Sequence, residues 1–147
     1  MKQVLGLCMG LLLSSQVMAW GTVGRWESGW GQGTSEYIAV NAQHNQLYIA
    51  CNGSDAPMMS LKVGNKEYGT QPAKPFALII DGQVFDDIAA TDSRVGSQNF
   101  VYAWDKIRKA KNLQAKTADG KLITLPLAGA AKVLPSSRSR DFPCSGL

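Results

Sequence analysis

The chain has 147 residues, with 15 basic and 11 acidic side chains, a formal net charge of +4, three cysteines and one histidine. This length suits one domain with a hydrophobic core, and the dispersed charge lacks the dense basic face of a nucleic-acid binder, so we expect no nucleic-acid partner. One histidine and two cysteines beyond the N-terminal segment cannot complete a closed four-ligand metal site without carboxylates. We therefore expect no metal and no cofactor.

Residues 1–19 have the three parts of a cleavable secretory signal peptide. Lys2 gives a positive start, an apolar run follows over 4–13, and the segment ends in Val17-Met18-Ala19. Small or aliphatic residues at those last positions suit a signal peptidase. The apolar run is shorter than the ~20 residues that cross a bilayer. We expect cleavage after Ala19, a periplasmic or secreted location, and no membrane-spanning segment in the mature chain.

The next segment, 20–33, is rich in glycine and tryptophan. Its glycines disfavour a helix, so we expect an extended arm with at most a short strand near Arg25 and Trp26. Trp20, Trp26 and Trp30 are candidate binding residues, because aromatic side chains dominate binding hot spots. The alternative is that they pack on the sheet or in the core, which we favour for Trp26.

Alternating apolar residues and turn signals predict β-strands over much of the remaining chain. Asp81-Gly82 between two apolar runs is typical of a type I′ hairpin, and a second hairpin is expected around 118–120. The expected strands are 35–40, 47–51, 58–63, 76–80, 83–85, 113–116 and 121–127.

One helix is predicted over about 99–111, with Ser97 as its N-cap. Phe100, Ala103, Trp104 and Ile107 recur at helical spacing, and a short second helix is possible over 128–134. The sequence therefore predicts a mainly β, α+β fold over 34–147: an antiparallel sheet or small sandwich with one packed helix.

Cys51 and Cys144 are the cysteines that follow the signal segment. An oxidising compartment and an even count predict a disulfide between them. Free thiols or an intermolecular bond are the alternatives. The bond would close a loop of nearly the whole domain, which the chain-entropy model credits with ~4–5 kcal/mol.

Two further groups of residues have candidate chemistry. Lys106, Arg108 and Lys109 lie in a basic run that suits an anionic partner, although a solvated helix face is the more common outcome. A small hydrolase would need His44 or a pair from Asp81, Asp86, Asp87 and Asp92. No catalytic motif frames these residues, so we expect a protein that is not an enzyme.

The order of features resembles small exported bacterial envelope proteins of the invasion-associated locus B type, and also accessory proteins of type VI secretion. The resemblance covers most of residues 26–144. It rests on LYIAC at 47–51, FALIIDG at 76–82, FVYAWDKIRKAKNL at 100–113, ADGKLITLPLAGAA at 118–131 and the late cysteine. It implies a periplasmic, sandwich-like domain and carries over no catalytic residue.

The sequence thus predicts a non-catalytic module that binds another envelope or exported protein, in an inhibitor, immunity-type or secretion-accessory role. Binding of a glycan or peptidoglycan through the N-terminal tryptophans is the first alternative. A small hydrolase is the second.

Overall fold

The computed structural model describes residues 20–145, which form two antiparallel sheets and two helices. The predicted signal peptide at 1–19 lies outside the described residues. The first sheet follows chain order: β1 (Trp26–Gly31), β2 (Thr34–Val40), β3 (Gln46–Cys51), β4 (Met58–Val63) and β5 (Lys66–Tyr68). The second sheet has the order β7-β6-β8-β9: β6 (Phe76–Ile80), β7 (Gln83–Phe85), β8 (Leu113–Thr117) and β9 (Leu122–Thr124). The helices are α1 (Arg94–Ile107) and α2 (Ala130–Val133).

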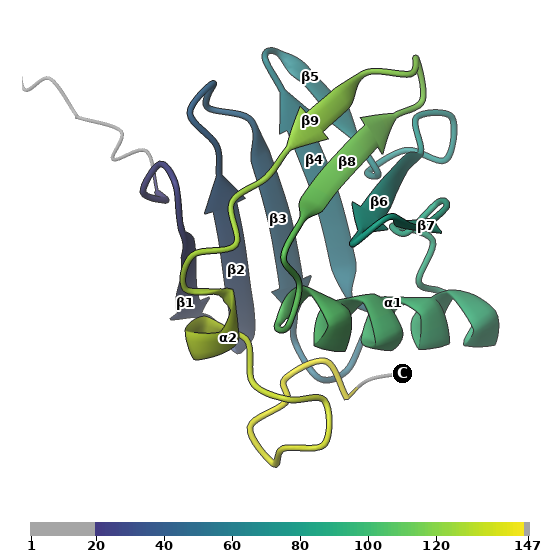
Figure 1. The fold of residues 1–147 in the computed structure, drawn as a ribbon. Coiled ribbons are helices and arrows are strands. Elements are labelled where there is room, and N and C mark those ends of the chain that lie inside the picture. Colours follow the sequence, from purple (N-terminus) through teal and green to yellow (C-terminus); the bar gives the residue numbers. More distant parts are fainter. Residues whose placement is uncertain (1–19, 146–147) are drawn as a thin grey trace, which may run out of the picture.

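The two sheets share one hydrophobic core, and α1 lies across one end of them (Figure 1). Side chains alternate between the two faces of a strand. Leu47 and Ile49 of β3 are therefore fully buried, whereas Tyr48 between them points away from the core and is half-buried. The predicted mainly β, α+β fold is confirmed, and sequence alternation decides which face of each strand meets the core.

The predicted helix is present, but it begins earlier than expected. Ser93 is the N-cap of α1, and its Oγ accepts a hydrogen bond from the backbone N–H of Gly96 at 3.0 Å. The expected cap, Ser97, instead lies inside the helix and donates from its hydroxyl to the carbonyl of Arg94. The chain therefore enters the helix one turn before the position that the sequence indicated.

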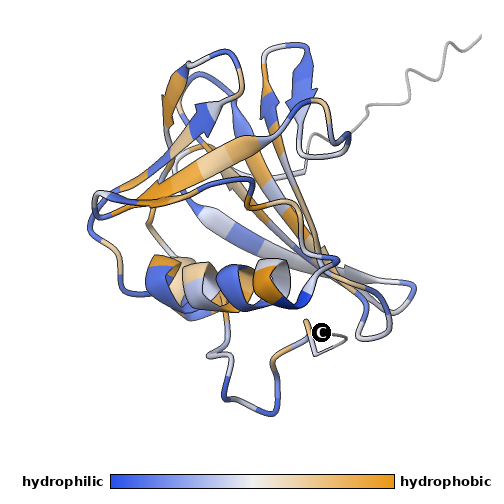
Figure 2. Cartoon of the chain, turned by 90° about the vertical axis from the view of Figure 1, so that its right-hand side faces the viewer, coloured by the Kyte–Doolittle hydropathy of each residue, from blue (hydrophilic) through white to orange (hydrophobic). Residues whose placement is uncertain are grey.

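The helix also ends earlier, at Ile107 rather than near 111. The carboxylate of Asp81 accepts hydrogen bonds from the backbone N–H groups of Lys111 and Asn112, each at 2.9 Å, and so turns the chain into β8. The predicted apolar residues Phe100, Ala103, Trp104 and Ile107 are buried, and α1 carries hydrophobic and hydrophilic residues along its length (Figure 2). Within residues 20–145, neither helix has the length and apolar character of a membrane-spanning segment.

The hairpin between β6 and β7 forms where the sequence predicted it. Asp81 and Gly82 have φ values of 49° and 82°, as both central positions of a type I′ turn require. The three-residue strand β5, in contrast, was not expected. It follows a turn at 64–65 and is too short to show alternation.

The glycine- and tryptophan-rich segment 20–33 is not a separate arm, contrary to our expectation. Its second half is β1, which pairs with β2 from Trp26 opposite Ala39 to Gly31 opposite Thr34. Glycine weakens a strand through its backbone entropy, but six consecutive residue pairs with β2 outweigh that tendency here. The sheet therefore begins before residue 34.

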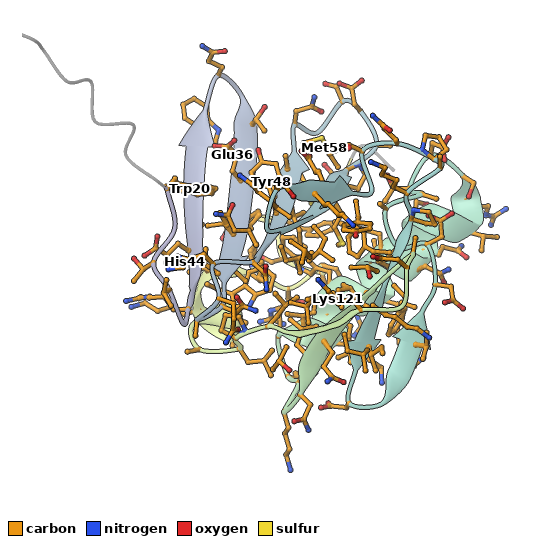
Figure 3. The ribbon with its side chains drawn as sticks, turned by 90° about the horizontal axis from the view of Figure 1, so that it is seen from above. Trp20, Glu36, His44, Tyr48, Met58 and Lys121 are labelled. Atoms are coloured by element: carbon orange, nitrogen blue, oxygen red, sulfur yellow. A yellow bond between two sulfur atoms is a disulfide. The ribbon has the colours of Figure 1, made fainter. Side chains whose placement is uncertain are left out.

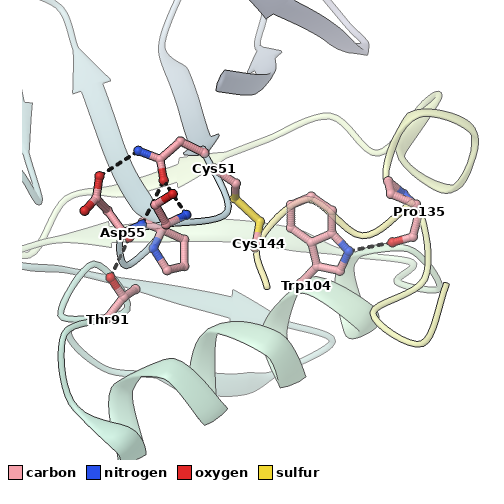
Figure 4. Close-up of a disulfide and its surroundings, with 9 residues drawn as sticks. Cys51, Asp55, Thr91, Trp104, Pro135 and Cys144 are labelled. Carbon is pink, nitrogen blue, oxygen red and sulfur yellow. Dashed lines mark hydrogen bonds between the residues drawn. A yellow bond between two sulfur atoms is a disulfide. The ribbon is translucent and has the colours of Figure 1, made fainter. Parts of the chain in front are cut away.

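A disulfide joins Cys51, at the end of β3, to Cys144 in the C-terminal tail (Figure 4). Both cysteines are buried, and their Cα atoms are 4.9 Å apart. The tail also packs on α1: the indole N–H of Trp104 donates to the carbonyl of Pro135 at 2.7 Å, and Phe142 meets the Trp104 ring edge-on at 5.5 Å. These contacts close the core at the end where α1 lies.

Replacing both cysteines with serine should lower the free energy of unfolding by about 2–5 kcal/mol, because the disulfide restricts the unfolded chain. Urea denaturation of the oxidised protein and of the double variant measures the difference. A reducing agent should destabilise the wild type to a similar extent and leave the variant unchanged. A loss below about 1 kcal/mol would contradict the structural role of the bond.

Gly69→Ala should destabilise the protein by about 3 kcal/mol. Gly69 has a φ of +90°, and an added Cβ would lie 2.6 Å from the Phe76 ring and 2.7 Å from the carbonyl oxygen of Met59. Gly64→Ala is the matched control, because φ is also positive there (+62°) but no atom lies within 4 Å. Equal losses in the two variants, measured by urea denaturation, would show that the crowding at Gly69 has no effect.

Candidate functional site

The outer face of the first sheet, which points away from the core, carries an open groove of about 520 Å³ that we call the outer-sheet groove. Its lining combines aromatic, thioether, carboxylate and amide groups. The lining residues are Gly31, Gln32, Thr34, Glu36, Tyr48, Ala50, Asn52, Asp55, Ala56 and Met58.

Strand register explains why these side chains meet. Gly29, Glu36, Ala50 and Met58 lie opposite one another across β1, β2, β3 and β4. Residues in such a row share one face of the sheet. Gly29 and Ala50 have little or no side chain, so they leave low positions between the larger groups.

Trp20 lies over one of these low positions. An added Cβ on Gly29 would be 3.1 Å from the Trp20 ring, so the indole rests directly on the glycine backbone. The ring meets Tyr48 edge-on, with centroids 6.3 Å apart and an interplanar angle of 81°. Trp20, Tyr48 and Met58 thus follow one another across the sheet, beside Glu36 (Figure 3).

A short hydrogen bond joins the two central groups of the groove. The Tyr48 hydroxyl donates to Glu36 Oε1 at 2.6 Å. Burial, and after it the hydrogen bond to Glu36 and the charge of Glu36, together raise the pKa of Tyr48 to about 12. Tyr48 therefore keeps its proton over the physiological range and holds the Glu36 carboxylate in place.

A tight turn forms one end of the groove. Asn52 follows Cys51 directly, and its amide donates to Asp55 Oδ2 at 2.7 Å. The amide oxygen of Asn52 accepts from the backbone N–H groups of Ser54 and Asp55, at 3.0 and 2.8 Å. The turn is therefore held by its own polar groups, and Asp55 keeps a fixed place at the rim.

The structure does not bring the three predicted tryptophans together. Trp26 is 0% exposed and donates its indole N–H to the carbonyl of Pro126 at 2.9 Å. Its ring is part of the core, which is the alternative that the sequence favoured for Trp26, so it is not available as a binding residue. Trp30 is 74% exposed, but alternation along β1 places it on the face opposite Gly29 and Trp20. Of the three, Trp20 alone borders the outer-sheet groove.

The predicted basic residues belong to α1 and the turn after it, away from this groove. Arg108 donates from Nε to the carbonyl of Leu134 at 2.7 Å, so its guanidinium holds the C-terminal tail. The ammonium of Lys106 lies 5.2 Å from the centre of the Tyr102 ring, a cation–π contact. Lys109 is exposed. The three side chains therefore lie in different surroundings, and two of them, Arg108 and Lys106, make contacts within the chain.

The residues considered for a hydrolase lie in separate turns. His44 is exposed in the turn between β2 and β3, at the end of the sheet away from Asn52. Asp81 lies in the hairpin of the second sheet, where the backbone N–H of Asn112 and then that of Lys111 lower its pKa. Asp86 and Asp87 follow β7, and Asp92 precedes α1. Within residues 20–145, no three of the metal-ligating side chain types cluster.

A larger groove, of about 820 Å³, runs between α1 and the C-terminal tail. Several of its polar groups are paired within the chain: Ser137 donates from its backbone N–H and its hydroxyl to Asp105, and the Thr91 hydroxyl donates to the carbonyl of Pro57. The outer-sheet groove, with exposed Met58 in its lining and exposed Trp20 at its border, is the better candidate site.

Glu36, Tyr48 and Met58 were not among the residues predicted from the sequence. Alternation in two predicted strands could have indicated that Glu36 and Tyr48 point outward from the sheet. What the sequence did not show was the register that pairs Glu36 with Ala50 and Ala50 with Met58.

The fold and the groove define a disulfide-linked protein of two antiparallel sheets with an open groove on one outer face. The chain belongs to the YfjT family, whose model matches residues 24–134. No curated protein and no solved structure gave a significant match. The family match does not bear on the invasion-associated locus B or type VI resemblance, which stays a prediction.

Glu36→Gln should lower the pKa of Tyr48 from about 12 while leaving it above 10.0, because the charge is lost but the burial remains. Stability that depends on protonated Tyr48 is fully present below pH 10 and is lost as the pH rises through about 12. The titration can be followed by NMR of ¹³C-labelled tyrosine, with Tyr48→Phe to assign the signal. An unchanged pKa would contradict the pairing.

Proposed function

We propose that this protein is a non-catalytic binding protein of the periplasm or the extracellular space, and that it binds another exported protein through the outer-sheet groove. The observation that carries the proposal is the line of Trp20, Tyr48 and Met58 across the sheet, beside the carboxylate of Glu36. Tryptophan, tyrosine and methionine are enriched in protein interfaces, with polar groups at their rims.

Exposure supports this assignment. Trp20 is 38% exposed and Met58 46% exposed, although both lie on a sheet whose inner face is well packed. Covering the remaining apolar surface of such side chains is favourable by ~25 cal/mol per Å². The rigid sheet and the self-bonded turn at Asn52 would hold the groove in shape, which lowers the entropy cost of binding.

Ring geometry favours a protein over a glycan. Trp20 and Tyr48 stand at 81° to each other and therefore do not form a flat platform for a sugar face. Trp30 lies on the opposite side of the sheet and cannot extend such a platform. Glycan binding is kept as the second candidate, because Asn52, Asp55 and Glu36 offer hydrogen-bonding groups beside an aromatic ring.

An inhibitor, immunity-type or secretion-accessory role fits a rigid module that presents one surface to a partner. The disulfide is consistent with export to an oxidising compartment. Within that role the protein would act by occupying a surface of its partner, with no chemical step.

Trp20→Ala and Tyr48→Ala should each weaken partner binding about 10- to 30-fold, since truncating an interface hot spot typically costs ~2 kcal/mol. The measurement is an affinity pull-down from periplasmic extract with quantitative mass spectrometry, followed by titration of the recovered partner. Val84→Ala and Val95→Ala are matched controls, because both side chains are exposed and apolar but lie outside the groove.

A partner that both alanine variants of the groove retain at wild-type affinity would contradict the proposal. Loss of binding in the Val84 and Val95 controls would place the interface elsewhere. If soluble peptidoglycan fragments changed the tryptophan fluorescence of the wild-type protein but not that of Trp20→Ala, glycan binding would become the better-supported function.

A further inference from the structure

The outer-sheet groove is acidic on a chain that is basic as a whole. Its lining contains Glu36 and Asp55 but no lysine or arginine, although the chain has 15 basic and 11 acidic residues. In the part of the chain that the structure describes, the one ion pair within 4.0 Å joins Lys66 to Asp119. The two carboxylates of the groove therefore have no basic partner among the described residues.

Each of these carboxylates is fixed through one oxygen and leaves the other open. Glu36 accepts the Tyr48 hydroxyl on Oε1, and Asp55 accepts the Asn52 amide on Oδ2. Among residues 20–145, side-chain hydrogen bonds reach neither Glu36 Oε2 nor Asp55 Oδ1. A carboxylate that is positioned but incompletely satisfied is well suited to a charge-assisted hydrogen bond from a ligand.

The surfaces beside the carboxylates suit the rest of a lysine or arginine side chain. Ala50 lies between Glu36 and Met58 in the cross-strand row and leaves room over the sheet. Tyr48 and Met58 offer apolar walls along which an aliphatic stem can lie. The rings of Trp20 and Tyr48 attract a cation through their faces.

We propose that the outer-sheet groove binds an extended segment of the partner protein through a lysine or arginine side chain, an inference that rests on the proposed function. The charged head meets Glu36 and Asp55, and the stem lies over Ala50 between Tyr48 and Met58. The occupant is thus a basic peptide segment, chosen by charge complementarity.

The test uses three acetylated and amidated hexapeptides as probes: alternating Ala and Lys, alternating Ala and Gln, and alternating Ala and Glu. Binding to the disulfide-bonded protein is followed by ¹H–¹⁵N NMR, which reports the Trp20 indole and the backbone of β2, β3 and β4. The lysine peptide should shift these signals and bind at least 5-fold more tightly than the glutamine peptide. The glutamate peptide should not bind, and added salt should weaken binding of the lysine peptide.

Glu36→Gln combined with Asp55→Asn should weaken binding of the lysine peptide about 5- to 10-fold. The matched control, Asp86→Asn with Asp87→Asn, removes the same charge from exposed positions outside the groove and should have no such effect. The inference is overturned if the lysine peptide gives no shifts, if the glutamine peptide binds equally well, or if both double variants behave alike.

Failure of the inference and failure of the proposed function can be told apart. If Trp20→Ala and Tyr48→Ala weaken capture of a protein partner as predicted while the lysine peptide does not bind, the groove is an interface and the basic occupant is wrong. If Trp20→Ala and Tyr48→Ala capture the partner normally, the proposed function itself is wrong.

Discussion

The bond between Cys51 and Cys144 is the constraint on which the rest of the molecule depends. It ties the end of β3 to a C-terminal tail that covers Trp104, and Trp104 in turn packs edge-on against Tyr37 on the inner face of the first sheet at 5.0 Å. One covalent link thus joins the first sheet, α1 and the tail. A core of this size gains most from a link that closes a long loop, because such a loop has the most entropy to lose.

The same link positions the candidate site. Ala50 precedes Cys51 in β3 and forms part of the outer-sheet groove, and Asn52 follows it and begins the turn that holds Asp55. Alternation sends the cysteine inward and its two neighbours outward. Packing around the disulfide on the inner face of the first sheet therefore fixes the positions of Asn52 and Asp55 on the outer face. A binding surface held in this way needs little rearrangement to meet a partner.

Local patterns in the sequence predicted most of the strands, the Asp81-Gly82 hairpin and the apolar face of α1. Those features depend on neighbouring residues and a fixed period. The extent of β1 was missed because its glycines have low strand propensity, and pairing with β2 outweighs that propensity. The groove was missed for a related reason: Glu36 and Met58 meet through Ala50 only once three strands are in register, and Trp20 reaches Tyr48 only because Gly29 has no side chain.

The central claim is that the outer-sheet groove faces the partner in the cell. Site-specific photocrosslinking tests it most directly, with a benzophenone amino acid in place of Met58 and, as the reference, in place of Val84, both of which are exposed. The account predicts one crosslinked protein species from position 58 and none from position 84, and it predicts that adding Trp20→Ala lowers the yield of the species at 58. Crosslinking from position 84 but not from 58 would contradict it.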